Sequence, residues 1–344
     1  MRERRRPVLR DERITLSHGA GGKATRDLVT ALFLEALGNE TLEALGDSAV
    51  LPAPGGRLAF TTDGYVVHPL VFPGGDIGEL AVNGTVNDLA VAGARPLWLT
   101  AGFVIEEGLL VSDLRRIVES MAAAARRAGV AVVAGDTKVV ERGKADGLYV
   151  TTSGVGVLEH DLALEPSRIR PGDRVLLSGT LADHGMAVMI ARGDLHLEGD
   201  VESDTAPVHE LATALLSLGE GLRWMRDPTR GGIATALNEL AAQSGLAVRM
   251  REPALPVRAP VAAACEILGI DPLYVANEGK LVAVVAADAA DDALALLHAH
   301  PLGADAVEIG VIEVEPEGMV LLDTALGGSR IVDVLVGDPL PRIC

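Results

Sequence analysis

The chain ends on a cysteine, Cys344, in the sequence Pro-Arg-Ile-Cys. A thiolate is a strong nucleophile, and at a chain end no following residues shield the sulfur. A Cys-a-a-X prenylation signal is excluded, because it needs cysteine four places from the end, where Pro341 stands. A terminal cysteine taken alone is more often an ordinary surface residue, so its chemistry depends on the rest of the sequence.

Four aspartates have the residue type and setting of metal ligands. Asp47 and Asp136 each follow a glycine, Asp63 precedes one, and Asp88 lies in an apolar segment. Asp63 and Asp136 come at the ends of β-type runs. An isolated Asp-Gly pair is usually a turn, but four such residues favour a shared site for Mg²⁺, which prefers carboxylate oxygens and bridges nucleotide phosphates.

Two further segments are suited to an anion. Residues 17–23, Ser-His-Gly-Ala-Gly-Gly-Lys, form a glycine-rich loop ending in Lys23, which is not a Walker A motif. Residues 225–233 place Asp-Pro-Thr before a glycine pair that opens a helix, and helix N-termini attract anions. The alternatives are a flexible surface loop and a plain capping turn.

The roles of four further residues are interpreted from their setting in the sequence. Asn87 and Asn83 are four apart and share a helix face, pointing into a site or making helix-end hydrogen bonds. Glu278, just before the apolar run 281–285, is either a base or a solvated turn residue. Cys265 lies on an apolar helix face, which favours packing.

The hydrophobic pattern predicts alternating strands and helices, that is, an α+β or α/β fold. In the first half, strands are expected at 58–62, 97–105, 130–134 and 148–157, with helices at 78–92 and 112–128. Ser112 is the expected N-cap and Gly129 the residue that ends the second helix. The second half repeats the alternation, with strands expected at 174–178, 246–250, 281–286 and 307–312, and helices at 183–192, 206–218, 231–244, 258–267 and 288–299.

The alternating pattern is interrupted near residue 165 by the segment Glu-Pro-Ser-Arg-Ile-Arg-Pro, where we expect a domain boundary. We expect a basic N-terminal tail (1–13), an N-terminal domain (14–163), a C-terminal α/β domain (164–334) and a flexible tail (335–344) that carries Cys344. At 344 residues the chain is long enough for two cores.

The composition restricts the class of partner and the compartment. The formal charge of −18 argues against nucleic acid and anionic membranes. Two cysteines are too few for a disulfide framework, which together with the absence of a signal-peptide pattern predicts a cytoplasmic protein.

The motifs, and their order along the chain, resemble those of the ATP-binding superfamily of aminoimidazole ribonucleotide synthetase and selenophosphate synthetase. Within it, the chain is similar to the HypE family of hydrogenase maturation factors, from about Ile14 to the terminal Pro-Arg-Ile-Cys. The resemblance implies a homodimer whose N-terminal sheets pair into a barrel, with a C-terminal α/β sandwich. ATP and Mg²⁺ would bind at the interface. The implied metal ligands, which also contact the nucleotide, are Asp47, Asp63, Asp88 and Asp136, and Lys23 and Asn87 would complete the nucleotide site.

The resemblance also implies the reaction. A carbamoyltransferase, HypF, would place a carbamoyl group on Cys344. ATP-dependent dehydration would convert the thiocarboxamide to a thiocyanate, with release of ADP and phosphate, and the HypC–HypD complex would accept the cyanide for the iron of [NiFe]-hydrogenase. Glu278 would act as the base, and Lys138 would polarise the carbamoyl oxygen.

Two other functions fit the same motifs. One is another small-molecule kinase or synthetase of the superfamily, although selenophosphate synthetases usually carry a reactive cysteine or selenocysteine in the glycine loop, where this chain has Ser17 and His18. The other is a nucleotide-sensing scaffold that binds ATP without chemistry. Turnover of ATP by a carbamoylated sample separates an enzyme from a scaffold.

Overall fold

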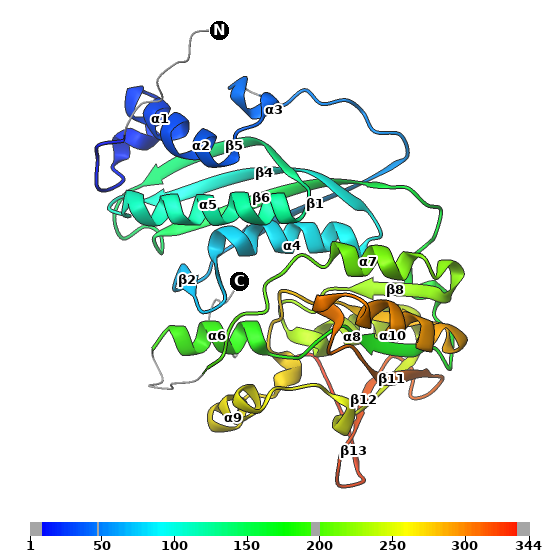
Figure 1. Ribbon diagram of the computed structural model, residues 1–344. Coiled ribbons are helices and arrows are strands. Elements are labelled where there is room, and N and C mark those ends of the chain that lie inside the picture. The colour runs from blue at the N-terminus through cyan, green and yellow to red at the C-terminus, as the bar shows by residue number, and fades with distance from the viewer. Residues whose placement is uncertain (1–8, 47, 194–199, 336–344) are drawn as a thin grey trace.

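A mixed α/β architecture with one large sheet in each half of the chain is seen in the computed structural model, which describes residues 9–46, 48–193 and 200–335 (Figure 1). The first sheet has four strands in the order β1 (Arg57–Tyr65), β6 (Leu148–Leu158), β4 (Arg95–Glu106) and β5 (Ala131–Val140). β4 and β5 run parallel, whereas the other two pairings are antiparallel. β1 and β5 are therefore the two edges of this sheet.

Two helices, α4 (Ile77–Val91) and α5 (Val111–Arg127), cover one face of the first sheet (Figure 1). In α5 the apolar residues recur every three or four positions, as Leu114, Ile117 and Met121 illustrate, so one face is buried and the other is open to water. The short strands β2 (Val71–Phe72) and β3 (Gly75–Asp76) lead into α4. The Asp76 carboxylate caps α4 by accepting hydrogen bonds from the backbone N–H groups of Gly78 and Glu79.

The helix α4 is buried on almost every side, because it lies between the first sheet and the C-terminal half of the chain (Figure 1). It packs on β1, β4 and β6 on one side and on α7 (His209–Leu216) and β8 (Leu222–Arg226) on the other. Gly78 allows α4 to approach α5 closely, since a Cβ atom there would overlap the carbonyl oxygen of Ile117. The polar residues of α4 therefore face protein rather than solvent.

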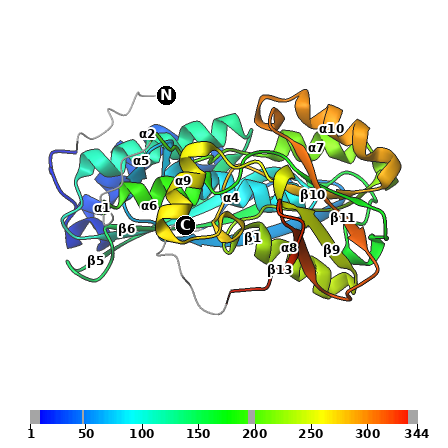
Figure 2. The ribbon, with the colours of Figure 1, turned by 90° about the horizontal axis from the view of Figure 1, so that it is seen from below.

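The second sheet is largely antiparallel and has α7 and α10 (Ala290–His298) along one side and α8 (Gly232–Ser244) along the other (Figure 2). Two further helices of this half are α6 (Asp183–Ala191) and α9 (Ala259–Leu268). Its strand order is β13 (Ser329–Ile331), β12 (Val320–Asp323), β9 (Ala247–Arg251), β11 (Val307–Glu313), β7 (Arg174–Leu177), β10 (Val282–Val285) and β8.

At the N-terminal end, the 3-10 turn η1 (Leu16–Gly19) and three short helices lie beside the β5 edge of the first sheet. The helices are α1 (Lys23–Leu28), α2 (Leu34–Leu37) and α3 (Glu40–Glu43), with η2 (Val29–Phe33) joining the first two. The predicted alternation of strands and helices is confirmed. Among the described residues, no helix combines the length and apolar composition that crossing a membrane requires.

Some predicted element boundaries are wrong. β1 and β5 continue through Asp63 and Asp136, so these residues lie inside strands rather than at strand ends. Strands β8, β12 and β13 were not predicted, and α7 begins at His209 instead of residue 206. The predicted N-cap at Ser112 is also wrong.

A tertiary contact replaces that N-cap. The helix α5 begins at Val111 after Leu110, and no side chain caps it. The backbone N–H of Val111 instead donates to the carbonyl of Glu12 at 2.9 Å, and Arg13 forms a β-bridge with Leu110. Residues 12–14 are thus paired to the N-terminal domain, next to the expected end of the basic tail at residue 13. The boundaries of the domains and tails stay predictions.

We expect Gly78→Ala to lower the free energy of unfolding by about 1–3 kcal/mol, the usual cost of overpacking. The new methyl group would press on the backbone of α5, which cannot rotate away as a side chain can. Chemical denaturation measures the effect. Gly55→Ala is the control, because nothing lies within 4 Å of a Cβ atom built there. Equal stability of the two variants would contradict the close packing of α4 on α5.

Candidate functional site

A small cavity of about 50 Å³ lies where the two halves of the chain meet, and four carboxylates line it. Asp63 comes from β1 and Asp88 from α4, whereas Asp227 follows β8 and Glu278 precedes β10. The other lining residues are Gly64, Tyr65, Gly84, Thr229 and Arg230. Two aspartates that the sequence predicts as metal ligands are therefore brought together with the predicted base.

Hydroxyl groups hold the two N-terminal aspartates. Asp88 accepts a hydrogen bond from the Thr61 hydroxyl at 2.7 Å. Asp63 accepts longer bonds, each 3.4 Å, from the hydroxyls of Tyr65 and Thr85. Gly84 makes room for this arrangement, because a Cβ atom there would overlap the hydroxyl of Tyr65.

The C-terminal half contributes Asp227 and Glu278 from two loops at adjacent strands of the second sheet. The Asn277 side chain joins these loops, since its Nδ2 donates to the carbonyl of Pro228 at 2.9 Å. Its Oδ1 accepts from the backbone N–H of Ala182 at 2.8 Å. Glu278 is 4% exposed, which rules out the solvated-turn interpretation.

Burial, together with the nearby negative charges, raises the pKa values of three of the acids that line the cavity. Burial, followed by the nearby charge of Asp88, raises the pKa of Asp63 to about 6. The same two causes raise the pKa of Asp227 to about 7. Burial and then Asp227 raise the pKa of Glu278 well above its ordinary value. A bound cation would relieve this repulsion, so the donor set suits a divalent metal.

The sequence-based site omitted Asp227 from the metal ligands. Its Asp-Pro-Thr motif predicts an anion-binding helix start or a plain capping turn, although it contains a carboxylate. Among residues 9–46, 48–193 and 200–335, no group of three His, Cys, Asp or Glu side chains is already arranged as a metal site. Three aspartates nevertheless converge on the cavity: Asp63, Asp88 and Asp227.

Asn87 is tied to the protein and does not line the cavity. Its side-chain N–H groups donate to the carbonyls of Ala206 at 3.0 Å and Glu278 at 3.1 Å, and its oxygen accepts from the N–H of Val208 at 2.8 Å. It is 1% exposed. Nucleotide binding by Asn87 stays a prediction, and these contacts give it a structural task between the two halves.

A second group of predicted site residues lies on the opposite edge of the first sheet. Asp136 and Lys138 are exposed on β5, where Lys138 Nζ lies 3.2 Å from Asp136 Oδ2. β5 is three strands from β1, about 14 Å at the usual strand spacing. A single chain therefore does not bring Asp136 and Lys138 to the cavity that contains Asp63 and Glu278.

The glycine loop belongs to this second group. A Cβ atom on Gly19 would come within 2.6 Å of the backbone nitrogen of Val139, so the loop packs tightly on β5. The exposed Lys23 follows it and starts α1. A mainly apolar cavity of about 270 Å³ lies here, between the N-terminal helices and β5, and Asp136 contributes to its wall. Asp47 and Cys344 lie outside the described residues.

Cys265 has the packing role that the sequence predicts. It is 2% exposed, and burial raises the pKa of its thiol to about 11. A thiol in this setting is a poor nucleophile at neutral pH. The reactive cysteine of the prediction, Cys344, is therefore the remaining cysteine of the sequence.

Comparisons with known proteins agree with this architecture. Residues 45–158 match the N-terminal domain, and residues 170–323 the C-terminal domain, of AIR synthase related proteins. Carbamoyl dehydratase HypE of Bradyrhizobium diazoefficiens is 55% identical over 98% of this chain and 97% of its own length.

Solved structures show the same relation. A crystal structure of hydrogenase maturation protein HypE in complex with ATP has a TM-score of 0.91 and 45% identity, and the match covers 96% of this chain and 99% of that one. HypE in a HypE–HypF complex has a TM-score of 0.79 and 48% identity, covering 91% and 100%.

We expect Asp63→Asn and Asp227→Asn to stabilise the metal-free protein at pH 8 but not at pH 4. Unfolded aspartate has a pKa near 3.8, whereas the folded values are about 6 and 7. The folded state binds more protons between these limits, so stability falls as pH rises through the window from about 4 to 7. An amide removes that cost, and the melting temperature at pH 8 should rise by about a few degrees.

The exposed Asp305 provides the control, Asp305→Asn, for which we expect no pH-dependent difference. Thermal melts at both pH values in the presence of a chelator measure the effect. Destabilisation of both cavity variants at pH 8 would show that the carboxylates are structural rather than held in place for a ligand.

Proposed function

The chain belongs to the carbamoyl dehydratase HypE family, and from that premise we propose how its residues carry out the reaction. The protein is an ATP-dependent carbamoyl dehydratase of hydrogenase maturation. The observation that carries the mechanism is the meeting of Asp63 and Asp88 with Asp227 and Glu278 in one buried cavity. Acids packed this closely suit a divalent cation, and such a cation in turn binds a phosphate chain.

The reaction converts the thiocarboxamide of carbamoylated Cys344 to a thiocyanate. An amide oxygen is a poor leaving group, so it first takes the γ-phosphoryl group of ATP, which gives ADP and an iminophosphate. Cleavage of the C–O bond then releases phosphate as the carbon–nitrogen triple bond forms. Both N–H protons must leave, and Glu278, at the wall of the cavity, is the base that accepts a proton from nitrogen.

Mg²⁺ would be held by Asp63, Asp88 and Asp227, with Asp47 completing the set. Bound there, it would align the phosphates and neutralise the aspartates, which favours the ionised form of Glu278. Lys138 polarises the carbamoyl oxygen, and Lys23, with its glycine loop, binds the phosphates. Asp136 joins the metal and nucleotide site from β5.

A homodimer reconciles the two groups of residues. Asp136 and Lys138 lie on one edge of the first sheet, and the carboxylate cavity lies at the other. The exposed face of β1 carries Leu58 and Phe60, which are 59% and 71% exposed, as expected of a surface that a second copy covers. Pairing of the two sheets into a barrel would bring the β5 group of one protomer to the cavity of its partner.

The remaining partners follow from the chemistry. HypF, which forms a complex with a relative 48% identical to this chain, is the partner that carbamoylates Cys344. The thiocyanate needs an iron acceptor, and we assign that role to the HypC–HypD complex. A free thiol favours a reducing compartment and the reaction consumes ATP, so the cytoplasm is the proposed location.

Cys344→Ala should bind ATP normally but take no carbamoyl group from HypF, because the alanine has no nucleophile. Intact-protein mass spectrometry after incubation with HypF, ATP and carbamoyl phosphate measures the adduct, and loss of one water reports dehydration. Cys265→Ala is the matched control and should react as the wild type does. A carbamoyl adduct on the Cys344→Ala variant would contradict the assignment of Cys344 as the carbamoylated residue. ATP turnover without carbamoylation would favour another kinase or synthetase, and ATP binding without turnover would favour a scaffold.

Asp63→Asn and Asp136→Asn should each abolish Mg²⁺-dependent ATP turnover, but mixed dimers of the two should recover it. If one site takes Asp63 from one protomer and Asp136 from its partner, a mixed dimer has one intact site. Random mixing then restores about a quarter of wild-type sites. Native mass spectrometry verifies the mixed dimer before turnover is measured. No recovery in verified mixed dimers would show that the two residues do not share a site across the interface.

A further inference from the structure

An extended segment, residues 203–208, runs between the two halves of the chain and touches both. We call it the strap. The sequence predicts a helix that starts at residue 206, within the strap, but α7 begins only at His209. Because the strap is extended, its backbone groups are free to bond with side chains on either side.

The N-terminal half of the chain forms hydrogen bonds with the strap at several points. The backbone N–H of Ser203 donates to the carbonyl of Pro73 at 2.8 Å. The Asn83 side chain donates to the Thr205 hydroxyl at 3.1 Å, and Asn87 holds Ala206 and Val208 through the bonds described above. Asn83 and Asn87 lie on α4 and are buried. Asn87 directly precedes Asp88 in the sequence. The strap is therefore fixed relative to the N-terminal aspartates.

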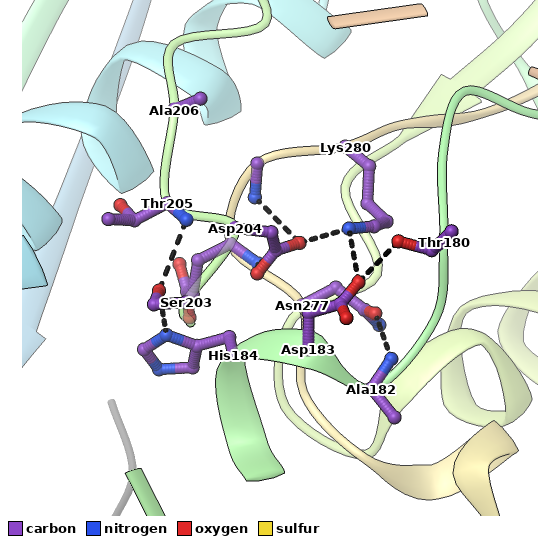
Figure 3. Close-up of polar contacts among 12 residues, drawn as sticks. Thr180, Ala182, Asp183, His184, Ser203, Asp204, Thr205, Ala206, Asn277 and Lys280 are labelled. Carbon is purple, nitrogen blue, oxygen red and sulfur yellow. Dashed lines mark hydrogen bonds and ion pairs between the residues drawn. The ribbon is translucent and has the colours of Figure 1, made fainter. Parts of the chain in front are cut away.

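The C-terminal half binds the strap through one carboxylate of the strap, that of Asp204 (Figure 3). Its oxygens accept from the backbone N–H of Glu278 at 3.2 Å and of Gly279 at 3.3 Å. They also accept from the Lys280 ammonium. Gly279 is required here, because a Cβ atom would overlap the carbonyl oxygen of Asp204.

A second carboxylate also forms an ion pair with the Lys280 ammonium. Asp183 lies 3.7 Å from Lys280 Nζ and also accepts from Arg258 Nε at 2.6 Å. The side chains of Asp183, Lys280 and Asp204 are 3%, 4% and 11% exposed, so these three charges are largely shielded from water, whereas Arg258 is partly exposed. Buried charges must be paired, and removal of one partner from such a pair is costly. The pairing of these charged side chains therefore fixes the position of the 278–280 backbone.

We propose that the strap is a positioning element that sets the Glu278 carboxylate against Asp63 and Asp88, with Asp204 as the positioning residue. The inference rests on the proposed role of Glu278 as the base. Asp204 does not line the carboxylate cavity. It acts through the two backbone N–H groups and the lysine that it holds, and so ties the loop of the base to the helix α4, which carries Asp88.

The first test is Asp204→Asn, assayed on carbamoylated protein. The neutral amide cannot form the ion pair with Lys280, and its NH2 group cannot accept as a carboxylate oxygen does. The 278–280 loop therefore loses part of its anchor, while the ATP site keeps its residues. A displacement of about 1 Å at a reacting group costs up to about 100-fold in rate. We expect single-turnover dehydration, followed as loss of one water by mass, to slow about 10- to 100-fold. The dissociation constant of ATP, measured by calorimetry, should change less than about twofold.

The matched control is Asp173→Asn. Asp173 is also a buried acid of the C-terminal half, with its Oδ2 atom 3.5 Å from Arg223 Nε, but it does not line the cavity. The Asp173→Asn variant should dehydrate at the wild-type rate, because Asp173 does not hold the 278–280 loop. If Asp204→Asn does not fold, the double variant Asp204→Asn with Lys280→Gln replaces it, because it leaves no lone lysine charge.

The measured rates decide between the claims. Slow dehydration with unchanged ATP affinity in the Asp204 variant, and normal dehydration in the control, supports the proposal. Dehydration at the wild-type rate in the Asp204 variant overturns it, as does an equal slowing in Asp173→Asn. Glu278→Gln is assayed beside them, and a wild-type rate there would instead show that the proposed role of Glu278 is wrong.

Discussion

The burial of four carboxylates in one small cavity, where they also repel one another, is the constraint on which the rest of the structure depends. Each acid would be more stable in water, and the raised pKa values of Asp63, Asp227 and Glu278 express that cost. Such a site persists only if the surrounding fold holds it against its own charge. Buried hydroxyls, the Asn277 side chain and the Asp204–Lys280 pair do so here.

The helix α4 transmits that support between the halves of the molecule. It packs on the first sheet and on α7 and β8, so its polar residues can address both halves. Asp88 faces the cavity, Asn87 faces the strap, and Gly84 admits the Tyr65 hydroxyl. A helix with one solvated face could not do this, because the polar residues would hydrate instead of bonding to a second domain.

The same logic explains which site residues the sequence could reveal. Asp63, Asp88 and Glu278 were recognised from residue type and from the family motifs, and the structure brings them together. Asp227 was missed as a ligand because its motif also reads as a helix start. Asp204 and Lys280 were not recognised at all. Their importance comes from pairing over 76 residues of sequence, and no local pattern records such a pair.

Composition and hydrophobic periodicity by themselves determined the alternation of strands and helices, because burial of one face leaves a local repeat in the chain. Motif order also determined the family. Only the tertiary structure decided that β1 and β5 run on through Asp63 and Asp136, since strand pairing with β6 and β4 extends them past their glycines. It alone placed these aspartates on opposite edges of one sheet, because strand order is set by packing between distant segments, which no local sequence pattern encodes.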